Sequence, residues 1–194
     1  MGNFLNPQAY KLILASQSPR RKALLESLGY QFEQRIKEFE ESYPENLSAE
    51  EVPEFLSIKK AKAHLAELKE NELLITSDTV VILEDQILEK AANAEEAKQM
   101  LNALSGNTHQ VVSGVCLSSQ KKQKSFSVST TVFFKPLKEV EIDYYIKHYQ
   151  PFDKAGAYGI QEWIGQIGVE KIEGSFYNVM GLPVKELFEA IQKF

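Results

Sequence analysis

The sequence predicts an α/β protein with a mixed, twisted sheet flanked by helices. Segments typical of strands and of helices interleave along the chain, which is the pattern of helices packed on a sheet. No internal repeat or low-complexity linker interrupts this alternation. With 194 residues, 43% of them hydrophobic and 25% charged, the chain can bury a sizeable core. This length fits one domain, residues 1–194, or two lobes around a shared cleft.

The first predicted elements are a buried strand, a capped helix and a second strand. The apolar run in Lys11–Ser16 predicts the first strand. Ser18 is a good N-cap and Pro19 suits the first helical position, so we expect a helix over about 19–28. Tyr30–Ile36 alternates enough between apolar and polar residues to form the second strand.

A capping box predicts the next helix. Ser48 to Glu51, with the sequence SAEE, has the spacing of such a box, and we expect it to open a long helix to about Lys69. Beyond it, β-rich segments lie on either side of an Asp-Thr pair, before a tight turn and a further β-rich segment. In chain order these are Glu72–Ser77, Asp78-Thr79, Val80–Leu83, Glu84-Asp85 and Gln86–Glu89.

The remaining segments continue the alternation of helices and strands. Asn93 caps a helix that ends at Ser105-Gly106-Asn107. The lysine-rich turn Ser119–Gln123 joins two long strands as a solvated hairpin tip. The other expected elements are strands at about 109–118 and 124–134, a helix at about 138–149, the glycine-rich loop DKAGAYGIQ, a strand near 167–172 and a last helix from Pro183.

Charge and composition exclude several classes of protein. The net charge of −5 argues against a general binder of nucleic acids or membrane surfaces, so an anion site must be local. The single cysteine, Cys116, lies in the apolar run VVSGVCL and is expected to be a buried structural thiol. The N-terminal residues lack the pattern of a signal peptide, and no stretch approaches a transmembrane span. We therefore expect a cytoplasmic protein.

Two arginines fall in the first turn of the helix predicted after Ser18. The free N–H groups there carry roughly half a positive unit of charge, so Arg20 and Arg21 go against the usual preference for acidic residues. Two cations beside unpaired N–H groups make sense if an anion binds there, and phosphate is the usual one. The alternative is that both arginines are solvated and face away from each other.

Other polar residues stand at the ends of the predicted elements. Asp78 interrupts the apolar stretch LLITSDTVVIL, where a buried carboxylate needs a partner; a turn aspartate bonded to the backbone is the alternative. Lys90 follows a β-like ILE, where a strand-edge lysine is the simpler interpretation. Glu40-Glu41 and Lys60 lie in charged segments that are also consistent with a solvated surface. Glycines 156 and 159 permit unusual backbone angles or the close approach of a ligand.

Six motifs together resemble the Maf family of nucleoside triphosphate pyrophosphatases. In chain order they are LASQSPRR, SDTVV, ILEK, LSGNTH, DKAGAYGIQ and GLPV, from about Leu12 to the last helix. The resemblance implies an elongated, two-lobed Maf/ITPase-like α/β fold with the site in a central cleft, often in a homodimer. It also implies cytosolic enzymes that use a divalent cation, Mg²⁺ or Mn²⁺, to hydrolyse nucleoside triphosphates to the monophosphate and pyrophosphate.

The resemblance also implies roles for individual residues. Asp78 takes the place of the family's catalytic acid, usually assigned as the general base, and Glu41 matches an acid that helps to hold the metal. Asp78 either orients or deprotonates a water or binds the metal directly, and both roles stay open. Cations are needed to neutralise charge on the leaving pyrophosphate. The implied set is Asp78, Lys90 and Arg21 for catalysis, Glu41 and Asp78 for the metal, and Ser16, Arg20, Arg21, Lys60, Thr79, Lys90, Lys154 and Gln161 for the substrate.

Three residues bear on the choice of substrate. Arg20, Thr79 and Gln161 match the members of the family that act on dTTP and UTP. A glutamine amide offers one donor and one acceptor, which suits the edge of thymine or uracil. We expect a dTTP/UTP pyrophosphatase, with CTP and modified pyrimidine nucleotides as further candidates. The alternatives are a 7-methyl-GTP pyrophosphatase of the same family and a non-catalytic, nucleotide-sensing regulator of cell division.

Two details of the motifs carry separate expectations. The family usually has Lys-Pro where this chain has Lys90-Ala91, and without the proline the backbone at Lys90 is less restricted. We expect this to change the rate or the affinity without abolishing the reaction. His109 also matches the family, and we expect a structural role because no second ligand stands near it at metal-binding spacing.

Overall fold

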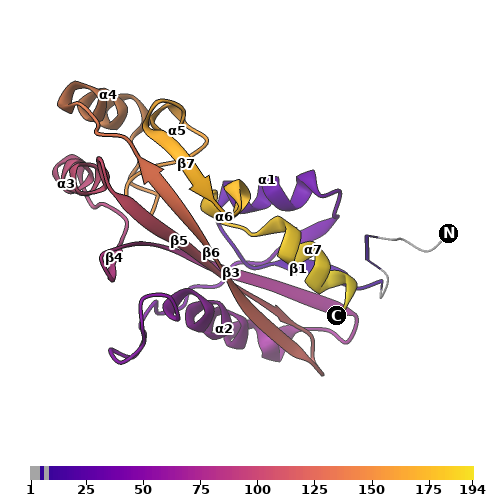
Figure 1. Ribbon diagram of the computed structural model, residues 1–194. Coiled ribbons are helices and arrows are strands. Elements are labelled where there is room, and N and C mark those ends of the chain that lie inside the picture. Colours follow the sequence, from indigo (N-terminus) through magenta and orange to yellow (C-terminus); the bar gives the residue numbers. More distant parts are fainter. Residues whose placement is uncertain (1–4, 7–8) are drawn as a thin grey trace. The chain divides into compact units, whose positions relative to one another are not determined.

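The computed structural model describes residues 5–6 and 9–194 and has the predicted mixed α/β architecture (Figure 1). Seven strands of this part of the chain form one sheet in the order β2-β1-β3-β5-β6-β7, with β4 paired to β3. The strands are β1 (Lys11–Leu14), β2 (Phe32–Gln34), β3 (Glu72–Leu83), β4 (Gln86–Leu88), β5 (Thr108–Ser118), β6 (Gln123–Phe134) and β7 (Val169–Glu173). The helices are α1 (Pro19–Ser27), α2 (Val52–His64), α3 (Ala94–Leu104), α4 (Glu139–Tyr149), α5 (Trp163–Gly168), α6 (Phe176–Val179) and α7 (Val184–Gln192), with a 3₁₀ turn at Leu65–Glu67.

Strand pairing explains the uninterrupted apolar run of β1. This strand runs parallel to both of its neighbours, β2 and β3, whereas β4 and β7 are antiparallel to theirs. Leu12, Ile13 and Leu14 are each at most 1% exposed. Parallel strands are commonly covered on both faces, so three consecutive apolar residues are needed here where an alternating pattern would leave one face polar.

The chain divides into two compact units. The first comprises the described residues up to Asp78 together with Ser113–Val128 and Gly181–Phe194. The second comprises Thr79–Val112 and Ser129–Met180. Strands β3, β5 and β6 each contribute residues to both units. A single domain with two lobes around a cleft stays a prediction.

The first unit has helices on both faces of its strands. Figure 1 shows α2 on one side and α1 and α7 on the other. On the α2 side, Ile13, Leu74 and Cys116 of three neighbouring strands pack with Ala61 of α2 and Leu68. Cys116 is fully buried, and burial raises the pKa of its thiol, so the prediction of a buried structural thiol is confirmed.

Glycine at position 114 permits close contact between β5 and the start of α2. A Cβ atom placed on Gly114 would lie 2.2 Å from backbone atoms of Pro53 and Glu54. Backbone atoms cannot yield as the end of a flexible side chain does, so only glycine fits at this contact. The contact fixes how closely α2 approaches the sheet.

The second unit has its own apolar core. It includes Leu101 and Leu104 of α3, Ile142 of α4 and Ile164 of α5, all of them fully buried. His109 of β5 lies in this core, 2% exposed, with Nε2 2.7 Å from the hydroxyl of Tyr158. Burial lowers the pKa of His109 to about 4, so its ring is neutral at pH 7. These contacts support the structural role expected for His109.

Helix α2 begins later than the capping box predicts. The Glu51 carboxylate accepts hydrogen bonds from the N–H and the hydroxyl of Ser48, at 2.9 and 2.8 Å, but this pair closes a turn, and the helix begins at Val52. Pro53 explains the difference, because proline is tolerated in the first turn of a helix but clashes with the preceding turn further along. The predicted helical end near Lys69 is also wrong, since α2 ends at His64 and a 3₁₀ turn follows.

Strand β3 runs without a break through Asp78-Thr79. The two separate β segments predicted there are one strand of 12 residues, so the turn considered for Asp78 is wrong. Burial on both sides of the pair keeps the strand extended, with Thr76 and Ser77 fully buried before it and Val80 buried after it. Near the end of the chain, residues 163–168 form α5 and the strand begins only at Val169, where a strand was expected from about 167.

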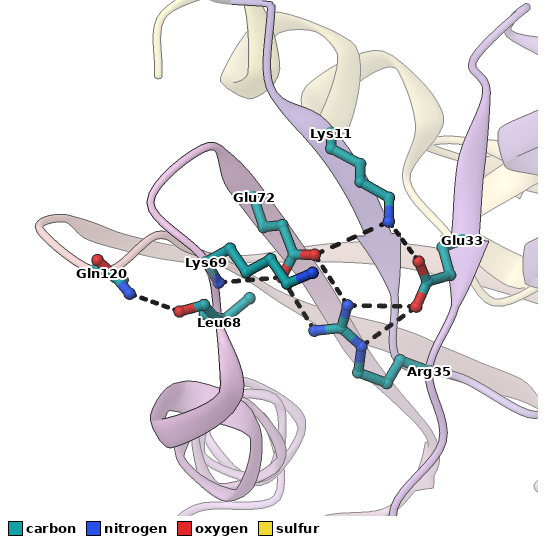
Figure 2. A network of polar contacts seen from close by, with 7 residues as sticks. All are labelled: Lys11, Glu33, Arg35, Leu68, Lys69, Glu72 and Gln120. Carbon is teal, nitrogen blue, oxygen red and sulfur yellow. Dashed lines mark hydrogen bonds and ion pairs between the residues drawn. The ribbon is translucent and has the colours of Figure 1, made fainter.

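A buried carboxylate lies at the start of β3 (Figure 2). Glu72 is 0% exposed, and its two oxygens accept hydrogen bonds from Nη1 and Nη2 of Arg35 at 3.0 and 2.9 Å. The backbone N–H of Lys69 donates to it at 3.1 Å, and Lys11 Nζ lies 3.9 Å away. The bonds from Arg35 lower the pKa of Glu72 to about 2. This pair ties β3 to the segment that follows β2.

The helices of the described residues are short. The longest, α2, has 13 residues, and none is long and apolar enough to cross a membrane.

Candidate active site

The start of α1 is built as the sequence predicts. Ser18 is the N-cap, and its hydroxyl accepts the Arg21 N–H at 3.3 Å. The buried Ser16 extends this arrangement, because its hydroxyl accepts the Ser18 N–H at 3.2 Å. The Ser16 carbonyl accepts the side-chain amide of Gln34 at 3.1 Å. The segment between β1 and α1 is therefore held by the hydroxyls of Ser16 and Ser18 and by Gln34 of β2, with the helix N-terminus beside it.

Arg21 joins three segments of the first unit. Its Nε donates to the carbonyl of Gly181 at 2.8 Å, and its Nη1 donates to the carbonyl of Ser77 at 2.9 Å. Burial lowers the pKa of Arg21, an effect that the negative charge of Asp78 opposes. An arginine stays protonated at neutral pH even so, which leaves a fixed positive charge beside the strand that carries Asp78. Arg20, the other arginine of this turn, is half-buried.

Lys60, Asp78 and Glu41 form a charged cluster in the same unit. Lys60 Nζ lies 2.5 Å from Oδ1 of Asp78 and 3.4 Å from Oε1 of Glu41. The side chains of Lys60 and Asp78 are 12% and 14% exposed, whereas that of Glu41 is 56% exposed. The Lys60 ammonium also lies 4.9 Å from the ring centre of Phe39. Residues far apart in the sequence, on a loop, on α2 and on β3, thus converge on one ammonium group.

The donor set of this cluster suits a magnesium-like cation. Asp78 and Glu41 already share one positive charge, that of Lys60, so both carboxylates can face one point. Mg²⁺ usually takes one or two carboxylates and completes its shell with waters and substrate phosphates. Among residues 5–6 and 9–194, no group of three or more His, Cys, Asp or Glu side chains that could hold a metal occurs.

Four predicted substrate residues lie in the second unit, namely Thr79, Lys90, Lys154 and Gln161. Thr79 is half-buried in β3, one residue after Asp78. Lys90 is exposed, and within the described residues its ammonium makes no ion pair, while its backbone pairs with Ala155 in an isolated bridge. The bridge holds Lys90 beside the loop that contains Lys154, although the proline of the family motif is absent.

Lys154, Glu162 and Tyr145 form a largely buried network, with Asp153 at its exposed edge. Lys154 is 8% exposed, and its Nζ lies 2.7 Å from Asp153 Oδ1 and 3.1 Å from Glu162 Oε1. Glu162 in turn accepts a hydrogen bond from the hydroxyl of Tyr145 on α4. The sequence held one signal for Glu162, since an acidic residue directly follows the motif that ends in Gln161.

The predicted residues thus divide between the two units. In the first unit Lys60, Asp78 and Glu41 are linked by ion pairs, Arg21 is bonded to the carbonyl of Ser77 next to Asp78, and Ser16 and Arg20 also lie there. Clusters of guanidinium, ammonium and carboxylate groups beside a helix N-terminus are typical of proteins that handle phosphorylated ligands. The fold and this group therefore define an α/β protein of the phosphate-handling class.

Comparison with known proteins identifies the family. The sequence profile of the family described as Maf-like protein matches residues 11–194, and the chain belongs to this family. A relative from Phocaeicola vulgatus, named dTTP/UTP pyrophosphatase, is 51% identical over 189 residues, covering 97% of this chain and 98% of its own. A relative from Porphyromonas gingivalis with the same name is 50% identical over 192 residues, covering 97% and 96%. The resemblance drawn from the six motifs is confirmed.

One solved structure is a more distant likeness. The nucleoside-triphosphatase / dITP/XTP pyrophosphatase from Mycobacterium abscessus is 17% identical, with a TM-score of 0.43 over 66% of this chain and 75% of its own.

Proposed function

We propose that this protein hydrolyses dTTP and UTP to the monophosphate and pyrophosphate. The names of relatives that share about half of its residues, dTTP/UTP pyrophosphatase, support this reaction. The single observation that carries it is the cluster in which Asp78 and Glu41 share the ammonium of Lys60, with Arg21 held to the same strand. Acids alone would serve a metal and cations alone would bind phosphate, but this reaction needs both.

The cations act on the triphosphate. Water adds to the α-phosphorus, the bond from that phosphorus to the bridging oxygen breaks, and pyrophosphate leaves with the negative charge. Arg20 and Arg21 at the start of α1, with Lys60 and Lys90, neutralise this growing charge. Arg21 is already oriented by two backbone carbonyls, so little reorganisation is needed when substrate binds.

Asp78 is the residue proposed to take the proton of the attacking water. Its Oδ1 is held by Lys60, while its other carboxylate oxygen makes no hydrogen bond or ion pair within the described residues. A carboxylate fixed through one oxygen can accept a proton through the other. The interaction with Lys60 also fixes the direction in which that free oxygen points.

A divalent cation, Mg²⁺ or Mn²⁺, is part of this proposal. Glu41 and Asp78 would hold it with the substrate phosphates, and it would supply charge neutralisation and a more acidic water. Thr79, Lys154 and Gln161 complete the proposed substrate set, and the amide of Gln161 is assigned to the edge of the pyrimidine base.

The test is pyrophosphate release from a panel of nucleotides with Mg²⁺ or Mn²⁺. The panel contains dTTP, UTP, CTP, GTP and 7-methyl-GTP, with the Asp78→Asn protein measured in parallel. Because Arg20, Thr79 and Gln161 match the pyrimidine-type set, we expect turnover of dTTP and UTP that requires the metal and is lost in the variant.

Two outcomes would contradict the proposal. Turnover of 7-methyl-GTP in preference to dTTP and UTP would support the proposed release of pyrophosphate but would contradict the proposed specificity for a pyrimidine base. Binding of nucleotides without any pyrophosphate release would favour the nucleotide-sensing regulator of cell division. The presence of both Asp78 and Glu41 favours the enzyme, since a sensor of phosphate needs only the cations.

Location and assembly are further parts of the proposal. The unpaired thiol of Cys116 supports a cytoplasmic location, because free cysteines are typical of reducing compartments. The homodimer implied by the family resemblance stays a prediction, as does the absence of nucleic-acid and membrane partners, which the net charge of −5 supports.

A further inference from the structure

We infer that Glu162, held by Tyr145, is a positioning residue that fixes the loop from Lys154 to Gln161 and thereby places the Gln161 amide against the pyrimidine base. The inference rests on the proposed function, because it concerns how the proposed substrate is recognised. All of these residues lie in the second unit.

Two contacts of this loop meet at the Tyr145–Glu162 pair. Glu162 Oε1 lies 3.1 Å from the Lys154 ammonium at the start of the loop. The other carboxylate oxygen accepts the hydroxyl of Tyr145, and the oxygen of that hydroxyl accepts the Gly159 N–H at 3.0 Å. The pair therefore ties both the beginning and the middle of the loop to α4.

Burial makes these contacts costly to lose. Tyr145 is 0% exposed and Lys154 is 8% exposed, so neither can exchange its partner freely for water. Burial, followed by the hydrogen bond to Glu162, raises the pKa of Tyr145 above its ordinary value. The hydroxyl accordingly stays protonated and remains a donor to Glu162 throughout the neutral pH range.

Gly159 shows how tightly the carboxylate lies against the loop. A Cβ atom at this position would be 2.8 Å from Cδ and 2.9 Å from Oε2 of Glu162. The Glu162 N–H also donates to the Gly159 carbonyl at 3.0 Å. The side chain of Glu162 thus folds back against the loop, and a side chain at position 159 would force the Glu162 carboxylate to move.

The placement of the Gln161 side chain depends on the Tyr145–Glu162 pair, because no contact of its own holds it among the described residues. Its side chain is half-buried and makes no hydrogen bond within the described part of the chain. The position of the amide is therefore set by the backbone between Gly159 and Glu162. A glutamine carbonyl can accept the N3–H of uracil, a contact that a methyl group on N3 would abolish.

The experiment compares kcat/KM for UTP with kcat/KM for UTP methylated at N3 of the uracil. We expect the wild-type protein to prefer UTP by at least about tenfold, because methylation leaves the Gln161 carbonyl without its donor. In Gln161→Ala the ratio should fall close to unity. In Tyr145→Phe it should fall by about threefold or more, since one hydrogen bond to the carboxylate and one to the loop are lost together.

The ratio separates an effect on positioning from a simple loss of folded protein. A loss of folded protein would lower kcat/KM for both substrates by the same factor and leave the ratio unchanged. Tyr149→Phe is the matched control, because this tyrosine stacks on Tyr145 at 5.0 Å between ring centres but is 38% exposed and its hydroxyl makes no hydrogen bond among the described residues. It should keep the wild-type ratio. If Tyr145→Phe does not fold, Glu162→Gln replaces it, since the shape is kept while the ion pair with Lys154 is lost.

Each outcome has a defined meaning. An unchanged ratio in a folded Tyr145→Phe or Glu162→Gln protein that hydrolyses UTP would overturn the inference alone. A Gln161→Ala protein that keeps the wild-type ratio would show that Gln161 does not contact N3 of the base, and this would overturn the inference. No hydrolysis of UTP by the wild-type protein would overturn the proposed function and this inference with it. In support, Tyr145→Phe combined with Gln161→Ala should give a ratio no lower than Gln161→Ala alone.

Discussion

Strand β3 carries two acidic residues, Glu72 and Asp78, that are partnered in opposite ways. Glu72 is fully buried, and both of its oxygens are occupied by Arg35, with the Lys69 N–H as a further donor. Asp78 is partly exposed, and one of its oxygens contacts Lys60, which also contacts Glu41. Both are carboxylates paired with a basic side chain, yet only Asp78 keeps an oxygen available for another ligand.

The difference separates a fully partnered ion pair from one that leaves an oxygen available. A buried carboxylate whose acceptor sites are filled by its partners has none left for a substrate, and its removal would leave the partner cation uncompensated. A carboxylate fixed through one oxygen is oriented but still able to bind a metal or a proton. On the proposed function, the two acids of this strand would therefore have different roles according to how completely their oxygens are hydrogen-bonded.

The largest expected effect is on the rate, at Asp78. Asp78→Asn should lower kcat for UTP by about 10²–10⁴-fold, because the group that accepts the proton of water is removed. It should change the free energy of unfolding less than a substitution at Glu72 does. Steady-state kinetics and urea denaturation of the same preparation check both parts. Full turnover in the variant would show that Asp78 is not the base.

The next effect is on stability, at Glu72. Glu72→Gln should cost about 2–3 kcal/mol of unfolding free energy, because the Arg35 guanidinium loses its bidentate carboxylate partner. The folded fraction should hydrolyse UTP at the wild-type kcat. Urea denaturation measures the cost, with Lys11→Met as the control. Lys11 Nζ lies 3.9 Å from Glu72 on a half-exposed side chain, so its loss should cost less than about 1 kcal/mol.

A Glu72→Gln protein with normal stability and a large loss of kcat would reverse the roles assigned to the two acids.

The smallest effect is a dependence of stability on pH. The pKa of Glu72 is lowered from 4.5 to about 2 in the folded protein, so folding favours its ionised form. This contribution is present in full above the unfolded pKa and is lost as the pH falls through the folded one. The difference in unfolding free energy between wild type and Glu72→Gln should therefore be constant above about pH 5 and shrink towards pH 2. A difference that grows on acidification would contradict the assignment.

The order and type of most elements could be predicted from the sequence, because local signals dominate there. The Ser18 cap, the Asn93 cap and the turn at Glu84-Asp85 all have the predicted places, since each depends on residues within a few positions of one another. The start of α2 differs from the position that the capping box predicts, because the steric restriction of Pro53 decides where this helix can begin.

Non-local contacts account for what the sequence could not predict. The partner of Asp78 is Lys60 of α2, which lies 18 positions away in the chain. The same applies to Glu162, whose importance becomes visible only when Tyr145 and Lys154 are brought beside it. The family resemblance implied roles for Asp78 and Lys60, but it did not show that the two form an ion pair.

The missing side chain at Gly114 has a consequence for how this protein can change over evolutionary time. Helix α2 carries Lys60, and the closeness of that helix to the sheet is fixed by the contact between Gly114 and Pro53. A mutation to any larger residue at position 114 would displace the helix and carry the Lys60 ammonium away from Asp78. If Lys60 and Asp78 act as proposed, selection on the chemistry would extend to this buried position, which takes no part in the reaction itself, and would restrict it to the smallest amino acid.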